Sequence, residues 1–372
     1  MSISAEAWKR GSGKARRSFI CHLSSVNCLL SFVLCILLLS GCTKQDSMYK
    51  ESRVLMDTYC TITVVSDSKS TAEEAIEAGF SEIKKLEDLL NYFSDKSEST
   101  ALGKAAGSHA VKVSPETLEI INKTIETAKA SEGAFDPTIA PVIRLWDFTH
   151  KSPEPSIPSV HVVDNALKLT GFNKIRVDEE RSEVFLEQQG MEIDLGGITK
   201  GYTADKAADA IRKKGIRSAL VAIAGDIRGF GTSTSGRAWK VGIQDPRPKT
   251  ESDRPWEEVI ATLYLEDRAI STSGDYQRFF MKEGKRFHHI LDPRTGFPAE
   301  TDLISASVIA PEGWMSDGLS TGIFILGAEK GMKVLENMGI DGVLVDSSKK
   351  VHITKGLKGK IEILNKDYTL SQ

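Results

Sequence analysis

The segment from Asp194 to Gly201 places a carboxylate, three glycines and Lys200 within eight residues. Glycines at a turn between a strand and a helix let a ligand approach the backbone closely. Amide groups at the start of a helix, together with the charge of Lys200, favour an anion such as a pyrophosphate. The segment has neither the P-loop spacing nor a Rossmann fingerprint. From these residues alone, a tight turn that packs a helix on a sheet explains the pattern equally well.

A second group of reactive side chains surrounds a turn at residues 288–296, where His289, Asp292 and Arg294 lie close in sequence. A histidine can take a proton from an attacking hydroxyl group, and an arginine can pair with two phosphate oxygens. The alternative is a capped turn in which Asp292 binds its own backbone and Arg294 is solvated. The residues themselves favour neither interpretation.

Asp317 and Thr321 lie four residues apart, so their side chains share one side of the segment if it is helical. Both carry hard oxygen atoms of the kind that bind Mg²⁺, which needs few protein ligands and usually keeps substrate phosphates in its shell. From these residues alone, the competing interpretation of Asp317 as a helix N-cap is favoured.

Three further segments are polar but compatible with ordinary structure. Residues 269–276 place small hydroxyl side chains and a glycine before Tyr276, whose ring could stack on an aromatic ligand. A β-turn is the more usual interpretation of such a segment. Residues 134–138 form a turn with an aromatic ring and a carboxylate, and residues 56–58 lie in a β-rich segment.

The elements that must position these groups mix strands and helices without a strict alternation. Strand patterns occupy residues 54–65, 218–224, 259–265 and 305–309. Helices are expected from Thr71, in a capping box with Glu74, from Ser114, and over residues 202–214. Residues 316–329 fit a loop, a strand or a helix, and their periodicity does not decide between these. The mixture favours an α+β fold over a doubly wound sheet.

The chain begins with a basic stretch over residues 9–17, followed by a mostly apolar run over residues 19–39. This order is typical of a secretory signal, and we expect a signal peptide over residues 1–41. An uncleaved transmembrane anchor is the alternative. The Ser-Gly-Cys step that ends at Cys42 resembles the lipobox of bacterial lipoproteins, which implies a lipid on Cys42.

Cleavage would leave 372 − 41 = 331 residues, a length suited to one large domain or two intimate ones. We expect residues 42–51 to form a polar tether and residues 52–366 to form the domain. Cys60 would be the one remaining thiol, which excludes an internal disulfide. The net charge of −3 gives no indication of a nucleic-acid partner, and a hydrophobic content of 40% fits a globular core.

Taken in order, these motifs resemble the ApbE family, the FAD:protein FMN transferases. The matching segments run from Met56 to about Gly327 and read Met-x-Thr, Ala-Phe-Asp-Pro-Thr, Leu-Trp-Asp-Phe, Asp-Leu-Gly-Gly-Ile-x-Lys-Gly, Gly-Asp-Ile, Thr-Ser-Gly-Asp-Tyr, His-Ile-Leu-Asp-Pro-Arg-Thr-Gly and Asp-x-x-x-Thr. The resemblance implies mixed, largely antiparallel sheets packed with helices, of the ApbE or T-fold type. It also implies Mg²⁺-dependent transfer of FMN from FAD to a threonine or serine of an acceptor protein through a phosphoester bond, with release of AMP.

The resemblance also assigns residues to roles, position by position. The residues expected to line the FAD site are Met56, Ala134, Phe135, Asp136, Asp194, Lys200, Tyr276, Ile290 and Leu291. The expected metal ligands are the backbone carbonyl of Thr199 and the side chains of Asp317 and Thr321, with Ser320 beside them. His289 would deprotonate the acceptor hydroxyl, with Asp292 and Arg294 shaping the site.

Three positions depart from the family pattern. Thr199 stands where alanine is usual, Phe93 where many members have tyrosine, and Ala224 where glycine is usual. If only the carbonyl of residue 199 binds metal, the first change is tolerable, whereas the second removes a polar contact to FAD.

Two other functions are compatible with the same motifs. An FAD pyrophosphatase would give FMN and AMP with water as the acceptor, and a flavin-binding lipoprotein of the periplasm would have no turnover. For the transferase, the resemblance implies acceptors among the flavin-bearing subunits of membrane redox pumps, either Na⁺-translocating NADH:quinone reductase or Rnf-type complexes. The expected location is the bacterial cell envelope, with a lipid anchor and the domain facing the periplasm.

Overall fold

The computed structural model describes residues 46–146, 148, 155–249 and 257–371. The expected signal peptide, Cys42 and the first residues of the expected tether lie outside this range, as does Asp147. Within the described ranges, no helix combines the length and apolar character needed to span a bilayer. The first strand begins at Ser47, inside the segment 42–51 that was expected to be a tether.

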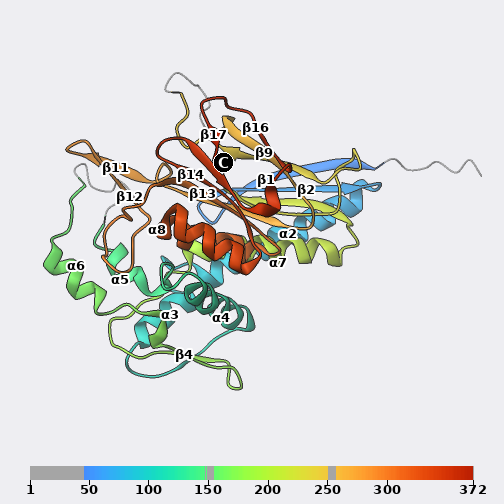
Figure 1. Ribbon diagram of the computed structural model, residues 1–372. Helices are drawn as coiled ribbons and strands as arrows, with labels where there is room; N and C mark the ends of the chain where they lie inside the picture. Colours follow the sequence, from blue (N-terminus) through green and yellow to red (C-terminus); the bar gives the residue numbers. More distant parts are fainter. Residues whose placement is uncertain (1–45, 147, 149–154, 250–256, 372) are drawn as a thin grey trace, which may run out of the picture. The chain divides into compact units, whose positions relative to one another are not determined.

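A nine-stranded sheet forms the centre of the described chain (Figure 1). In sheet order its strands are β1 (Ser47–Leu55), β2 (Thr58–Ser66), β6 (Ser218–Ile223), β7 (Asp226–Phe230), β10 (Ala269–Gly274), β13 (Leu303–Ala310), β14 (Asp341–Asp346), β15 (Lys350–Ile353) and β17 (Thr369–Leu370). Every neighbouring pair is antiparallel except β15 with β17.

Three smaller sheets complete the strands. They are β16 (Ile361–Ile363) with β9 (Val259–Leu265) and β8 (Trp239–Gln244), β3 (Val111–Lys112) with β5 (Glu183–Leu186) and β4 (Ile175–Asp178), and the hairpin of β11 (Phe279–Lys282) and β12 (Lys285–His288). All of their pairings are antiparallel. The largely antiparallel α+β architecture predicted from the sequence is confirmed.

Three long helices, α2 (Lys69–Leu90), α7 (Gly196–Lys213) and α8 (Gly313–Met338), contact the central sheet and lie side by side (Figure 1). Within the described residues, the other helices are α3 (Glu98–Ala105), α4 (Pro115–Ala130), α5 (Ala140–Ile143), α6 (Val160–Leu167) and the short 3₁₀ turns Pro137–Ile139, Phe172–Lys174 and Lys355–Leu357. Of these, α4 contacts α8 and α7.

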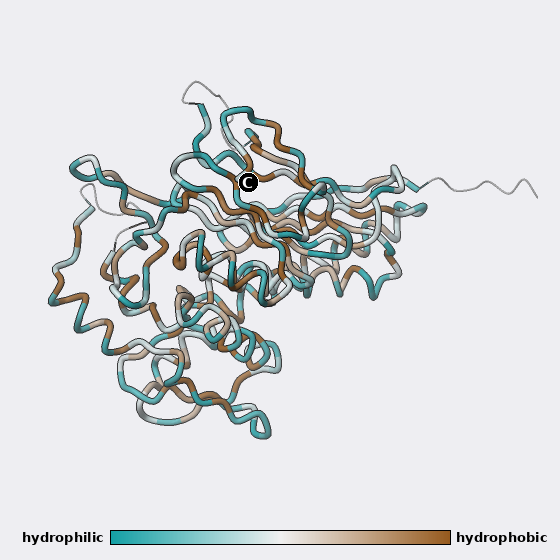
Figure 2. The backbone as a smooth tube through the Cα atoms, in the orientation of Figure 1, coloured by the Kyte–Doolittle hydropathy of each residue, from teal (hydrophilic) through white to brown (hydrophobic). Residues whose placement is uncertain are grey.

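The central strand β13 is buried on both faces, and its side chains alternate between two apolar layers. Ala306, Val308 and Ala310 pack with α8, whereas Ile309 packs with the layer formed by β8 and β9. Figure 2 shows the hydrophobic residues concentrated along these inner strands and helices. The sheet is therefore a rigid floor from which loops and helix ends can project polar groups.

Two helix starts differ from the sequence-based expectation. Ser68, not Thr71, is the N-cap of α2, and its hydroxyl accepts the backbone N–H of Thr71. Helix α7 begins at Gly196, six residues before the expected start, because the two adjacent glycines form its first turn. The segment 316–329 is helical, and Asp317 lies inside α8 rather than at its N-cap.

Candidate functional site

Helices α7 and α8 touch at two glycines. A Cβ atom on Gly201 would lie 2.0 Å from the carbonyl oxygen of Gly313, and one on Gly313 would lie 2.3 Å from the carbonyl oxygen of Gly201. No side chain fits at either position, so the two backbones meet directly. Asp317 accepts a hydrogen bond from the backbone N–H of Gly201 at 2.9 Å, which places the acidic group of α8 against the first turns of α7.

The N-terminus of α8 is held by a residue from α7. The carboxylate of Asp205 accepts the backbone N–H groups of Gly313 and Trp314 at 2.8 and 3.1 Å, and it pairs with Arg228 at 3.2 Å. Burial raises the pKa of Asp205 to about 6, although these bonds act in the opposite direction. The cap fixes the register of α8 one turn before Asp317.

Lys200 lies between two buried carboxylates. Its ammonium group is 2.6 Å from Asp226 and 3.6 Å from Asp317. Burial lowers the pKa of Lys200, but the two carboxylates more than offset this, so the lysine stays charged. Burial and repulsion by Asp226 raise the pKa of Asp317 to about 7. The cluster thus combines two carboxyl groups with one ammonium group, and a bound cation would interact favourably with it.

Hydroxyl groups continue this cluster along α8. Ser273 of β10 lies 2.8 Å from the hydroxyl of Ser320 and 3.1 Å from that of Thr321. Ser320 also donates to the carbonyl of Asp317 at 2.8 Å. A Cβ on Gly197 would lie 3.7 Å from the hydroxyl of Thr321. The expected metal ligands and the glycine-rich segment are therefore neighbours.

The donor set at this point suits a hard cation. It combines the carboxylate of Asp317 with the hydroxyl groups of Ser320 and Thr321, all of them oxygen donors. The hydroxyl of Thr199 donates to the carbonyl of Leu195 at 2.7 Å, which leaves its own carbonyl as the atom available to a metal. Among the described residues, no three His, Cys, Asp or Glu side chains converge on one point, so a ligand-rich cage is not what this region offers.

The loop before α5 packs against the glycine-rich turn. The ring of Phe135 would be 3.0 Å from a Cβ on Gly197, and the N–H of Asp194 donates to the carbonyl of Pro137 at 2.8 Å. Ala134 is buried beside Phe135. This contact makes residues 134–137 one wall of the candidate site.

Two expected FAD-site carboxylates are engaged within the protein. Asp136 accepts hydrogen bonds from the backbone N–H and hydroxyl of Thr138 at 2.8 and 2.6 Å and from the N–H of Phe172 at 3.0 Å. Asp194 accepts the N–H of Gly196 at 2.7 Å. Burial raises the pKa of both groups. Asp136 thus holds the wall in shape, while Asp194 fixes the start of α7.

Two tight turns with strained backbone lie at one end of the sheet. Met56 and Asp57 have φ values of 54° and 55°, and the N–H of Met56 donates to Glu87 at 2.5 Å. Ala224 has a φ of 53°, and its N–H donates to the carbonyl of Tyr59 at 3.0 Å. The second turn leads directly into Asp226. Left-handed conformations at residues other than glycine are uncommon, and they concentrate at functional sites.

His289 is half-buried at the end of the β11–β12 hairpin. Its Nδ1 atom lies 3.2 Å from the carbonyl oxygen of Arg278. Because a carbonyl only accepts, Nδ1 carries the hydrogen in the neutral ring and Nε2 keeps a free electron pair. Burial, followed by the positive charge of Arg278, lowers the pKa of His289 to about 4. The ring is therefore a neutral base at pH 7.

Asp292 and Arg294 form a closed pair beside His289. The guanidinium group of Arg294 donates to both carboxylate oxygens of Asp292 at 2.7 and 2.6 Å, and its N–H donates to the same side chain at 2.9 Å. Asp292 therefore caps its own turn, as in the alternative interpretation, but Arg294 is paired with Asp292 and is not simply solvated. The pair holds this part of the loop together.

The apolar residues of this loop are buried, and two aromatic residues from other segments pack near it. Ile290 and Leu291 are buried, and Ile290 accepts the N–H of Ala299 at 2.9 Å, so their side chains face the core. The ring of Tyr276 covers Gly274, where a Cβ would be 2.3 Å away. Trp146, from the Leu-Trp-Asp-Phe motif, donates to the carbonyl of Gly296 at 3.0 Å. This hydrogen bond connects the motif to the loop.

Several residues that build the site were not expected from the sequence. Asp226 is the closest carboxylate to Lys200, Asp205 caps α8, and Asp275 is held by a bidentate pair with Arg247 at 2.8 and 2.6 Å. The Gly-Asp-Ile motif marked Asp226, but no local spacing indicated its partner.

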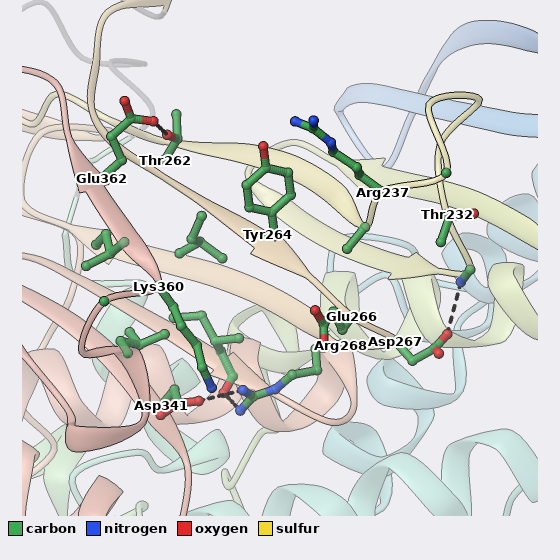
Figure 3. Close-up of a pocket in the computed structure, with 18 residues that line it drawn as sticks. Thr232, Arg237, Thr262, Tyr264, Glu266, Asp267, Arg268, Asp341, Lys360 and Glu362 are labelled. Atoms are coloured by element: carbon green, nitrogen blue, oxygen red, sulfur yellow. Dashed lines mark hydrogen bonds and ion pairs between the residues drawn. The ribbon is translucent and has the colours of Figure 1, made fainter.

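A separate hollow of about 890 Å³ lies on the β8–β9–β16 sheet (Figure 3). Its labelled side chains include Arg237, Tyr264, Arg268 and Asp341, and Arg268 pairs with Asp341. None of the residues expected to act on FAD or metal lines it.

The family model of the ApbE family matches residues 56–344. The chain belongs to the ApbE family. Relatives named FAD:protein FMN transferase from Klebsiella pneumoniae (strain 342) and Treponema pallidum (strain Nichols) are 31% and 30% identical to it. Each alignment covers 87% of this chain, and 97% and 91% of the two relatives.

Solved ApbE structures share the fold. The ApbE protein of Thermotoga maritima has a TM-score of 0.76 and 30% identity over 84% of this chain and 99% of that chain. Flavin transferase ApbE from Vibrio cholerae has a TM-score of 0.74 and 26% identity over 85% of this chain and 99% of that chain. The family resemblance inferred from the order of motifs is confirmed.

The three departures from the ApbE pattern have structural consequences. The hydroxyl of Thr199 donates to the carbonyl of Leu195 at the start of α7, so this ApbE chain accommodates the threonine without disturbing the site. Ala224 occupies a left-handed turn position where glycine avoids the steric cost. Phe93 is 78% exposed and packs edge-on against Tyr92, so it offers a ring but no hydroxyl.

Proposed function

We propose that this chain transfers FMN from FAD to a threonine or serine hydroxyl of an acceptor protein, forming a phosphoester bond and releasing AMP. The names of its relatives support this reaction. The observation that carries the proposal is the contact of Asp317 and Thr321 with the segment 196–201. A phosphoryl transfer needs an anion-binding turn and a cation site that are adjacent.

The first turn of α7 would hold the diphosphate of FAD, because the backbone at Gly196 and Gly197 is accessible and a helix N-terminus favours anions. Lys200 adds a permanent positive charge one turn further along. Phe135 and Tyr276 would border the flavin or adenine rings, with Met56 at the strained turn.

The acceptor hydroxyl would lose its proton to Nε2 of His289 as its oxygen bonds to the phosphorus of the FMN half. The bond from that phosphorus to the AMP oxygen breaks, and its electron pair leaves with AMP. The Asp292–Arg294 pair keeps the loop that carries His289 in place. The fixed tautomer of His289 leaves its free electron pair on the atom that must accept the proton.

Mg²⁺ would be held by the carbonyl of Thr199 and by Asp317 and Thr321, with Ser320 beside them. The Lys200 cluster supports this assignment, since a cation bound to Asp317 would offset the burial and the repulsion by Asp226 that raise its pKa. When bound, the ion neutralises charge on the phosphates.

Mass spectrometry of an acceptor protein after incubation with enzyme, FAD and Mg²⁺ tests the proposal. A gain of one FMN on a threonine or serine is expected, and Asp317→Ala and His289→Asn should each abolish it. Arg237→Gln, in the separate hollow, is the matched control and should transfer normally. Release of FMN and AMP without any adduct would identify a pyrophosphatase instead. FAD binding without turnover would identify a carrier.

The cellular setting follows from the leader and the family. We propose cleavage before Cys42, lipidation of Cys42, and location in the bacterial envelope with the domain facing the periplasm. Acceptors would be the flavin-bearing subunits of Na⁺-translocating NADH:quinone reductase or Rnf-type pumps. Labelling cells with an alkyne fatty acid and comparing the chain with a Cys42→Ala variant tests the anchor, because only the unsubstituted chain should incorporate the label.

A further inference from the structure

We propose that Arg278 is a further catalytic residue, whose guanidinium group contacts the phosphoryl group during transfer and faces His289. The inference rests on the proposed function and names a residue that the family motifs did not assign. Three observations support it: the position of Arg278 beside His289, the effect of its charge on the pKa of nearby groups, and the ion pairs that already engage the neighbouring cations.

Arg278 lies in the link between β10 and β11 and is bonded to the candidate base through its backbone. Its carbonyl oxygen accepts the backbone N–H of His289 at 3.0 Å and lies 3.2 Å from the imidazole Nδ1. The same residue therefore sets the tautomer of His289 and carries a positive side chain next to it. The side chain is exposed, so a substrate can reach it.

The positive charge of Arg278 acts on two groups that lie on different elements. It contributes to the lowered pKa of His289, and it opposes the rise in the pKa of Asp194 that burial causes. Asp194 marks the start of α7, where the diphosphate is proposed to bind. The charge of Arg278 is thus close enough to both the base and the start of α7 to act on each of them.

The neighbouring cations are all committed to partners within the protein. Arg247 pairs with Asp275, Arg294 with Asp292, and Lys200 with Asp226 and Asp317. Arg286 stacks on Phe279 at 3.9 Å and donates to the carbonyl of Asp275. Across the described ranges, the side chain of Arg278 makes no such pair with a carboxylate. Of these five cations, Arg278 is the one whose side chain is left available to an anionic substrate.

An arginine that is free to bind substrate at this point would offset the negative charge that develops during the transfer step. As the acceptor oxygen bonds to phosphorus and AMP leaves with the electron pair, negative charge spreads over the phosphoryl oxygens. Arginine donors can meet two of these oxygens at once, and such an arginine is worth roughly 10³–10⁵ in rate in other phosphoryl transfers. The same charge adds to the effect of burial, which is the main reason that the pKa of His289 is low and its ring is neutral and able to accept the proton.

The test compares Arg278→Gln and Arg278→Lys with a matched control, Lys282→Gln, which removes an exposed cation from β11 of the same hairpin. Transfer of FMN to an acceptor gives kcat and KM for FAD over a range of pH. NMR titration of the imidazole in the substrate-free protein gives the pKa of His289. The other charged groups that act on His289, His288 and Lys200, remain unchanged in all variants.

For Arg278→Gln we expect kcat to fall by at least about 100-fold, with a smaller change in KM, and the pKa of His289 to rise. Arg278→Lys should recover part of kcat and restore the pKa, and Lys282→Gln should match the parent chain. A kcat within threefold of the parent, or an unchanged His289 pKa in Arg278→Gln, would overturn the inference while leaving the proposed function intact. Failure of the parent chain to transfer FMN would overturn the proposed function, and the inference with it.

Discussion

Replacing Gly201 with alanine tests whether the contact between α7 and α8 builds the site. The new Cβ would lie 2.0 Å from the carbonyl oxygen of Gly313 and 2.7 Å from Cβ of Asp317. Ordinary contact begins near 3.4 Å, so the helices must separate by about 3.4 − 2.0 = 1.4 Å at this point. That movement pulls Asp317 away from the N–H of Gly201, now 2.9 Å from its carboxylate.

The cost follows from these distances. Overpacking of this size destabilises a protein by about 1–3 kcal/mol, and the lost hydrogen bond to a buried carboxylate adds about 1.5–3 kcal/mol. Together these contributions lower the expected free energy of unfolding of the metal-free protein by about 2.5–6 kcal/mol. Misplacement of reacting groups by about 1 Å can cost roughly 100-fold in rate, so transfer should fall by a similar factor and need more Mg²⁺.

Urea denaturation and Mg²⁺ titration of FMN transfer measure both effects. Gly103→Ala in α3 is the matched control, since its Cβ would meet the nearest atom at 3.4 Å. A helical alanine there should stabilise the chain by up to about 1 kcal/mol. If Gly201→Ala were as stable as the parent and showed the same Mg²⁺ dependence, the glycine contact would not be what positions Asp317.

Three further outcomes are expected. Ala224→Gly should raise the free energy of unfolding in urea by about 0.5–1 kcal/mol, because the left-handed turn penalises alanine by about 1–2 kcal/mol and glycine returns part of that in chain entropy; no gain would mean that the turn is unstrained. At saturating Mg²⁺, which would keep Asp317 ionised, the pKa of His289 near 4 predicts that kcat/KM stays level from pH 7 to about 5 and falls below 4. Because this folded-state pKa lies below the usual value of about 6.5, the stability that it contributes is present above about pH 6.5 and is lost as the pH falls toward 4. A rate limb near 6.5 under these conditions would contradict the assigned environment of His289. Arg237→Gln and Tyr264→Ala, in the separate hollow, should leave KM for FAD unchanged, and a raised KM would show that the hollow takes part in binding FAD.

The fold class could be predicted because local patterns specify it. The short segment of β13 rich in small and β-branched residues and the periodic apolar face of α2 can both be recognised from their residues. Helix ends were less accurate, since Ser68 and Thr71 are both good caps and the packing of α2 decides between them. At α7 the adjacent glycines signal a turn, whereas the structure uses them as the first turn of the helix.

The candidate site was predicted where it depends on motifs and missed where it depends on long-range contacts. Asp317 and Lys200 were identified from their segments, but the pairing of Asp226 with Lys200 was not, because the two residues lie on different elements. Asp205 caps a helix that begins 108 residues later, and no spacing rule encodes such a distance. Arg294, expected to help shape the site, is paired with the carboxylate two residues away.

The break in α8 at Gly327 affects where this helix can tolerate an insertion. Gly327 has φ 81° and ψ 175°, and the next N–H, that of Ala328, is accepted by Asp302 at 3.0 Å. The helix is therefore two hydrogen-bonded units joined by one non-helical residue. Because each unit has its own cap, an insertion after Gly327 would rotate only the second unit, and the non-helical backbone at Gly327 would accommodate the change. The unit that carries Asp317 and Thr321 would keep its rotational setting against α7, so length variation is expected to accumulate behind the joint and not in front of it.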